Sequence, residues 1–252
     1  MAHKRSVLTP TLIAIVGFLT VCPVIMLIFG SFSTGLGAFG EFTLDKYIKA
    51  YTDPELFDII VNTIIFVLGS SIVATGLALF LAYLNTRTDI PFKFLFRIIS
   101  IIPMMIPHIL FSVSWVLLLN PSNGLINLFL RQMPGLEDMA INIYTLPGMI
   151  LVEGLLDLPI AYLILAPALA SFDIALEESS KVCGSTTLRT LFRVTLPVLR
   201  PAILAAFILS LVLTWNEYFF AALLTSTNAN TLPVMVASQT GSQGISWWSM
   251  AA

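Results

Sequence analysis

Five long apolar segments, separated by short polar stretches, set the main limit on what this chain can fold into. They cover about residues 9 to 33, 59 to 84, 98 to 119, 142 to 170 and 201 to 225. A helix needs roughly 20 apolar residues to cross about 30 Å of hydrocarbon, and each segment is long enough. Since lipid offers the backbone no hydrogen-bond partners, we expect all five to be helical. The sequence therefore predicts an all-α, polytopic membrane helix bundle with five visible spans.

The composition supports the same fold class. Hydrophobic residues make up 58% of the 252 residues and charged residues only 10%, which is more apolar surface than a soluble domain of this length could bury. The net charge of −2 argues against nucleic acid as a partner, because no basic stripe exists to bind phosphates. The first apolar segment is uncharged from Ser6 to Gly40, so we interpret it as a retained span and not as a signal peptide.

The distribution of basic residues predicts the orientation of the chain. Cytoplasmic flanks of membrane helices carry an excess of Lys and Arg. With alternating spans, nine basic residues fall on one side: Lys4, Arg5, Arg87, Lys93, Arg97, Lys181, Arg189, Arg193 and Arg200. Three fall on the other: Lys46, Lys49 and Arg131. We therefore expect the N-terminus and residues 171–200 to be cytoplasmic.

Two further features concern the spans. Prolines interrupt several of them and predict kinks, at Pro23, Pro103, Pro107, Pro147, Pro159 and Pro167. The sequence at residues 247–252 is typical of the start of another helix, so we expect a sixth span that this sequence does not contain.

Residues 171–200 form a polar segment between the fourth and fifth spans. Asp173 can cap a short helix whose first turns carry Glu177 and Glu178, where the helix dipole favours negative charge. Gly184 permits a turn in the backbone. A second short helix follows, capped by Ser185, Thr186 or Thr187 and closed by Pro197. From this pattern alone, an amphipathic loop lying on lipid headgroups remains an alternative.

The spacing of residues in this segment resembles a known motif. The segment has Glu178-Ser179-Ser180, three residues, Gly184, nine residues, then Val194-Thr195-Leu196-Pro197. This is similar to the cytoplasmic loop of the permease subunits of bacterial ATP-binding cassette (ABC) importers, which has the form Glu-Ala-Ala, three residues, Gly, nine residues, Ile-x-Leu-Pro. The resemblance implies the MetI-like permease fold, with residues 1–252 as one transmembrane permease domain.

The resemblance also implies a role for residues 171–200, which we call the coupling loop. In such importers, this loop inserts into a groove on a cytoplasmic ATPase subunit and transmits its closure to the spans. The residues implied in coupling are Glu178, Ser179, Ser180, Gly184, Leu196 and Pro197. The implied partners are two cytoplasmic ATP-binding subunits, a second permease subunit of the same or a different kind, and an external solute-binding protein. The implied location is the bacterial plasma membrane.

The class of substrate stays open between two resemblances. Residues 1 to about 205 are most similar to polyamine, iron and aminoethylphosphonate permeases, whereas Trp215-Asn216-Glu217 resembles an element of carbohydrate permeases. Glu153 and Asp157 share one face of the fourth span, and intramembrane carboxylates usually face the bundle interior or an aqueous cavity. The candidate substrate path is therefore Glu153, Asp157, Trp215, Asn216 and Glu217. We expect a small polar solute, polyamine-like or related, with a carbohydrate as the alternative.

Other functions are weighed against this one. The carboxylates could instead pair with Asn, Tyr or backbone donors, or serve an ion-coupled secondary carrier, or belong to a structural subunit without a path of its own. No Gly-Lys pair occurs, so the chain has no P-loop, and we expect ATP to be used by a partner and no cofactor to be bound. His108 stands alone in the third span, so we predict no metal site, and the two histidines leave little scope for an enzyme.

Overall fold

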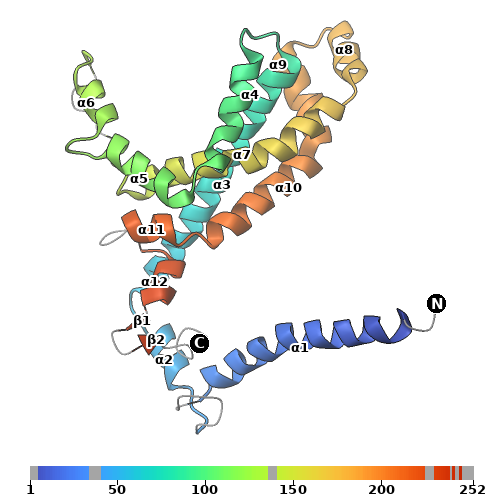
Figure 1. Ribbon diagram of the computed structural model, residues 1–252. Helices are drawn as coiled ribbons and strands as arrows, with labels where there is room; N and C mark the ends of the chain where they lie inside the picture. Colours follow the sequence, from blue (N-terminus) through green and yellow to red (C-terminus); the bar gives the residue numbers. More distant parts are fainter. Residues whose placement is uncertain are drawn as a thin grey trace. The chain divides into compact units, whose positions relative to one another are not determined.

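The computed structural model of the protein describes residues 5–33, 41–135, 141–224, 230–238, 240–241 and 244–245, and these residues are almost entirely helical (Figure 1). The four long helices are α1 (Arg5–Ser31), α3 (Leu56–Arg87), α7 (Leu146–Ser171) and α10 (Leu196–Trp215). The only strands among the described residues are β1 (Thr240–Gly241) and β2 (Gly244–Ile245), a two-residue antiparallel pair. The predicted all-α class is therefore confirmed. The chain divides into two compact units, 59–234 and the remainder.

The unit made of residues 1–58 and 235–252 contains α1 and α2 (Asp45–Tyr51). The ring of Phe32 stacks on the rings of Phe42 and Tyr47, with centroids 5.4 and 4.9 Å apart. The Lys46 ammonium donates to the carbonyl of Ser33 over 2.6 Å and so ties α2 to the end of α1. The apolar stretch Thr9–Ser31 is largely exposed and is buried only at its last two residues, which fits a helix whose side chains are solvated by lipid.

The helices of the unit 59–234 pack around α7. A Cβ atom on Gly154 would lie 2.6 Å from Cγ1 of Val73, so α3 and α7 approach closely because Gly154 has no side chain. Ala74, Ala78 and Ala82 form a fully buried stripe of small residues along α3. Such stripes let membrane helices pack at short range, where van der Waals contact replaces the hydrophobic effect. The other long neighbour of α7 is α10.

Shorter elements complete the unit. They are α4 (Lys93–Ile101), the 3₁₀ helix η1 (Ile102–Met105), α5 (His108–Leu119), α6 (Leu125–Arg131), α8 (Ile174–Val182), α9 (Thr187–Thr190), the π-helix η2 (Leu191–Thr195) and α11 (Phe219–Leu224). The last described helix, α12 (Leu232–Ser238), includes the boundary between the two units at residue 234. In Figure 1, α8 lies at the same end of the unit as the turn between α3 and α4.

The third predicted span is broken. The helical stretches Lys93–Met105 and His108–Leu119 meet at 111°, so among the described residues four helices, or five if this pair is one span, can cross a membrane. Pro103 and Pro107 lie at the break, as expected for residues that cannot continue a helical hydrogen-bond ladder.

A contact at the ends of two helices identifies this pair as one crossing. Arg87, the last residue of α3, donates from Nη2 to the carbonyl of Phe172 over 2.9 Å, so α3 and α7 end on the same side of the bilayer. Because α7 crosses once, Leu146 lies on the opposite side from Arg87. The chain between them must therefore cross once, which agrees with five spans.

The fifth span differs from the prediction in both of its ends. Pro197 does not close a separate helix: α9, η2 and α10 run continuously from Thr187 to Trp215. The π turn just before Pro197 widens the helix where the proline ring would meet the preceding turn. At its other end the helix stops at Trp215 and not near residue 225, because the chain turns at 216–218 before α11. Pro147 likewise lies in the first turn of α7 and makes no kink.

The predicted sixth span rests on residues 247–252, which lie outside the described residues.

Candidate functional site

The coupling loop is built from two capped helices. The Asp173 carboxylate accepts the backbone N–H of Ala175 over 2.9 Å at the start of α8, and the Thr186 hydroxyl accepts that of Arg189 over 3.4 Å at the start of α9. Both caps satisfy N–H groups that have no partner inside a helix. The predicted caps at Asp173 and Thr186 are therefore confirmed.

Gly184 makes the turn between α8 and α9. Its φ is +83°, a left-handed conformation that residues with a Cβ rarely adopt. Two backbone bonds close the end of α8, from Gly184 N–H to the carbonyl of Lys181 over 2.9 Å and from Ser185 N–H to that of Ser180 over 3.1 Å. This is the Schellman arrangement for ending a helix at a glycine. The hydroxyls of Ser180 and Thr190, 3.1 Å apart, then join α8 to α9.

The residues implied in coupling differ in exposure. Glu178, Ser179 and Gly184 are exposed, whereas Ser180, Leu196 and Pro197 are half-buried. Exposed apolar side chains accompany them, with Val182 88%, Leu188 68% and Phe192 65% exposed. The loop thus presents a mixed polar and apolar surface.

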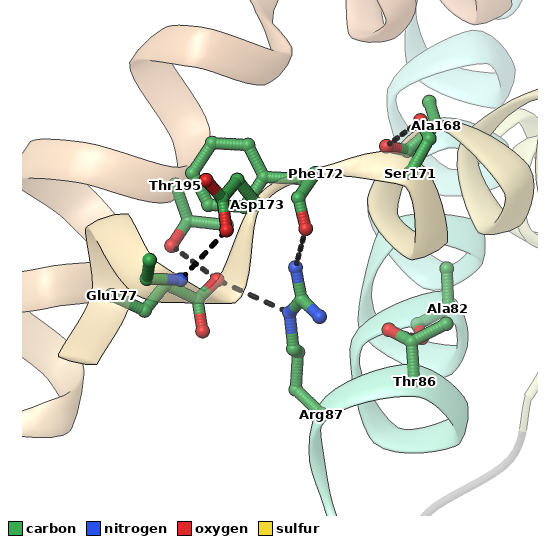
Figure 2. Close-up of polar contacts among 10 residues, drawn as sticks. Ala82, Thr86, Arg87, Ala168, Ser171, Phe172, Asp173, Glu177 and Thr195 are labelled. Atoms are coloured by element: carbon green, nitrogen blue, oxygen red, sulfur yellow. Dashed lines mark hydrogen bonds and ion pairs between the residues drawn. The ribbon is translucent and has the colours of Figure 1, made fainter.

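Glu177, next to the exposed Glu178, is instead buried in an ion pair (Figure 2). Its Oε1 lies 3.2 Å from Arg87 Nε, and the two side chains are only 9% and 7% exposed. The same oxygen accepts the Thr195 hydroxyl over 3.0 Å. One carboxylate of α8 therefore contacts both the end of α3 and the last residue of η2.

Arg87 makes further contacts that fix its orientation. Besides its bond to the Phe172 carbonyl, its guanidinium lies 5.6 Å from the centre of the Phe172 ring. A planar guanidinium can bond to two acceptors in one fork and contact an aromatic face, which a lysine ammonium cannot reproduce.

A second polar cluster lies inside the membrane-spanning part of the chain. Glu153 and Asp157 are 2% and 3% exposed, on the buried side of α7. Asp157 Oδ2 accepts the hydroxyl of Thr214 on α10 over 2.8 Å. Oε2 of Glu153 has no hydrogen-bond partner within the part of the chain that the structure describes. A buried polar atom of this kind requires a partner from elsewhere, such as water, another subunit or a solute.

The depth of this cluster follows from helix geometry. Asp157 lies about 16 Å along α7 from Leu146, at roughly 1.5 Å per residue. The whole of α7 spans about 39 Å at the same rise, longer than the roughly 30 Å hydrocarbon layer. Thr214, which contacts Asp157, is therefore at membrane depth, and so is the helix break that follows Trp215.

Two helix breaks meet at this depth. Nδ1 of His108, the first residue of α5, lies 3.6 Å from Oε2 of Glu217, in the turn after α10. The other oxygen of Glu217 accepts the backbone N–H of Phe220 over 2.9 Å. Beside them, Trp215 is 43% exposed, Asn216 is exposed, and the His108 side chain is 61% exposed. Irregular backbone at this depth is stable only where protein or an aqueous cavity covers it.

No group of three or more His, Cys, Asp and Glu side chains among the described residues has an arrangement that could hold a metal ion.

Comparison with known proteins identifies the family. The family model described as "Binding-protein-dependent transport system inner membrane component" matches residues 74–252, which include the coupling loop and more than half of the chain. The chain belongs to this family. Its members are multi-pass inner-membrane permease components of binding-protein-dependent transport systems, and not enzymes.

Two of three curated relatives of this chain are named for different solutes, and the third is named for none. A putative ABC transporter permease of Streptomyces antibioticus is 39% identical over 40% of the chain and 44% of its own length. The trehalose permease SugB of Mycobacterium tuberculosis is 29% identical over 79% of the chain and 67% of its own length. A putative 2-aminoethylphosphonate permease of Salmonella typhi is 30% identical over 47% of the chain and 39% of its own length. The chain thus spans less than half of two of these relatives.

Solved structures support the permease fold. A bacterial ABC transporter that imports the acidic polysaccharide alginate matches 98% of the chain and 87% of its own, with a TM-score of 0.75 and 20% identity. A second structure of a bacterial alginate ABC transporter, in complex with a periplasmic protein that holds an alginate pentasaccharide, has a TM-score of 0.74 and 21% identity.

Sequence reasoning found the elements of the permease but missed contacts between them. It assigned Glu178 to coupling and gave Glu177 no role beyond the first turns of the helix, whereas Glu177 is buried against Arg87, 90 positions away. It also identified no partner for His108, which contacts Glu217 across two helix breaks. Pro103 and Pro107, which precede His108, did indicate a helix break at this position. Nothing in the sequence near Glu177 indicated that it pairs with Arg87.

Proposed function

We propose that this chain forms part of the path of a carbohydrate across the bacterial plasma membrane, and that a cytoplasmic ATPase drives it through the coupling loop. The partners would be two ATP-binding subunits, a second permease subunit and an external solute-binding protein. The permease itself binds no cofactor, and ATP is used by the partner. Its N-terminus and coupling loop face the cytoplasm, in keeping with the bias of basic residues.

The observation that carries the proposal is the meeting of two helix breaks at membrane depth. Trp215 and Asn216 are exposed there beside Glu217 and His108. The exposed amide of Asn216 and imidazole of His108 would be costly against lipid, so they favour an aqueous path or a second subunit. An aromatic ring next to such groups suits a sugar, whose C–H faces pack on rings and whose hydroxyls bond to polar groups.

The similarity to known permeases favours a carbohydrate over the polyamine-like solute that the sequence first suggested. Likeness to the trehalose permease extends over 79% of the chain, whereas likeness to the aminoethylphosphonate permease covers 47%. The carboxylates accommodate a sugar as acceptors of hydroxyl hydrogen bonds.

An amine-bearing solute is the second candidate. The unpartnered Oε2 of Glu153, close to Asp157 on the same helix face, favours a cation if water carries a solute that deep.

Uptake by proteoliposomes tests the proposal. The chain is reconstituted with its ATP-binding subunits, permease partner and solute-binding protein, and uptake of radiolabelled trehalose, spermidine and 2-aminoethylphosphonate is compared. We expect ATP-dependent uptake of trehalose. Other oligosaccharides should inhibit this uptake by competing with trehalose. Uptake of spermidine alone would replace the carbohydrate with the amine. Uptake by the chain alone under a proton gradient would contradict the ATP-driven mechanism.

A further inference from the structure

The Glu177 carboxylate is shared by three elements that belong to different parts of the transport cycle. Arg87 ends α3, Glu177 lies in α8, and Thr195 is the last residue before α10. Glu178, the residue implied in contact with an ATPase, is exposed, whereas Glu177 is buried. Two adjacent residues of α8 therefore have different roles: Glu178 contributes to its exposed surface, and Glu177 attaches the helix to the spans.

The attachment to α3 is held by burial and by multiple contacts. Once Arg87 and Glu177 are shielded from water, separating them would leave two unpaired charges in a poorly solvated site. Arg87 also holds the carbonyl and the ring of Phe172, at the junction of α7 with the coupling loop (Figure 2). The Phe172 contacts fix the orientation of Arg87, and movement of α8 away from the end of α3 would have to break the ion pair between Arg87 and Glu177.

The attachment to α10 runs through an irregular helix. Thr195 donates to Glu177 from η2, a five-residue π-helix, and Thr190 at the end of α9 contacts Ser180 in α8. Stretches of π-helix are rare in proteins, and those that do occur are often found at functional sites. Here the π turn lies at the point where the loop becomes a membrane span.

We propose that Glu177 and Arg87 are positioning residues for energy coupling. They fasten α8 to α3 directly and to α10 through Thr195, so that a displacement of α8 moves the cytoplasmic ends of both spans as one body. This inference rests on the proposed function, since it needs an ATPase that acts on α8. It differs from a purely structural role, in which the ion pair would stabilise the fold and leave the yield of transport per ATP unaffected.

The test measures coupling separately from assembly. Glu177→Gln, Arg87→Gln and Arg87→Lys are each reconstituted in the full transporter, and solute uptake and ATP hydrolysis are recorded together. We expect the ATP-binding subunits to co-purify as with wild type, and solute taken up per ATP to fall at least about fivefold for both Gln variants. Arg87→Lys keeps the positive charge but loses the planar guanidinium with its several donors, so its solute uptake per ATP should be intermediate. Asp89→Asn, which breaks an exposed pair with Lys93 nearby, should change nothing.

Each other outcome overturns the proposal. An unchanged ratio in both Gln variants would show that the ion pair does not transmit movement. A loss of uptake in proportion to lost ATP-binding subunits would assign the pair to assembly. If the Gln variants do not fold, Thr195→Val removes only the hydroxyl bond to Glu177, and an unchanged ratio there would overturn the link to α10. If the wild-type transporter shows no ATP-dependent uptake, the proposed function itself fails, which is a distinct result.

Discussion

Gly184 adopts a backbone conformation that other residues reach only with strain. Its φ of +83° is needed for the turn, while no atom lies within 4 Å of the place a Cβ would occupy. Gly184→Ala therefore tests backbone strain alone, which costs roughly 1–2 kcal/mol in the left-handed region. We expect a loss of that size in the free energy of unfolding in detergent, with reduced ATP-driven uptake. Gly76→Ala is the matched control.

Gly76 is also open on all sides but lies inside α3 without a positive φ. Alanine there should be neutral or stabilising by up to about 1 kcal/mol, because glycine is a poor helix former. Equal destabilisation by both substitutions would contradict the role of the turn.

The hydrogen bond between Asp157 and Thr214 gives a second prediction at this scale. A double-mutant cycle with Asp157→Leu and Thr214→Val should show a coupling free energy of about 0.5–2 kcal/mol, the range for side-chain hydrogen bonds between membrane helices. Ser114→Ala is the control, since its hydroxyl bonds only to the carbonyl of Leu110 in its own helix. Purely additive effects at Asp157 and Thr214 would mean that α7 and α10 are not joined there.

Local residue patterns predicted the caps and the turn of the coupling loop, because each depends on neighbours within a few positions. Asp173, Thr186 and Gly184 act as their residue types suggest. The partner of Glu177 was not predictable in this way, because Arg87 meets it only after two further spans have crossed the membrane.

At the scale of elements, the contact between α3 and α7 depends on the absence of a side chain at Gly154. A Cβ there would lie 2.6 Å from Val73 Cγ1 and 3.1 Å from the carbonyl oxygen of Ser70. Gly154→Ala should destabilise the bundle by about 1–3 kcal/mol, the usual cost of overpacking. The measurement is thermal unfolding in detergent. Shortening Val73 to alanine would not relieve the clash, because Val73 Cβ would itself lie 2.7 Å from the new Cβ. An unchanged unfolding temperature in Gly154→Ala would contradict the close approach.

Hydropathy located the spans but not all of their breaks. Pro103 and Pro107 correctly indicated an interruption in the third span, since proline lacks an amide proton. The break at 216–218 was not predicted because apolar residues continue into α11. Pro197 predicted a helix end that the π turn of η2 prevents.

For the whole molecule, the five crossings place particular loops on opposite sides of the membrane. Cys183 is exposed in the coupling loop, and Ser122 is exposed between α5 and α6. In a Cys22→Ser background, a membrane-impermeant maleimide should label Cys183 only from the cytoplasmic side. With Cys183→Ser as well, a Ser122→Cys variant should be labelled only from outside. Labelling of both positions from one side would contradict the crossing assigned to the broken third span.

The family and fold followed from residue spacing and hydropathy, whereas the solute did not. The choice among solutes depends on which side chains reach the path, and that depends on contacts such as His108 with Glu217 that no local pattern encodes.

The central claim is that the coupling loop is a docking surface for an ATPase and not a loop resting on lipid. Val182, 88% exposed at the end of α8, is the place to test it. A photo-reactive phenylalanine analogue at Val182, activated in native membranes, should capture an ATP-binding subunit identified by mass spectrometry, while the same analogue at the 58% exposed Phe80 of α3 should not. Capture of lipid alone at Val182, with no ATP-binding subunit, would contradict the account.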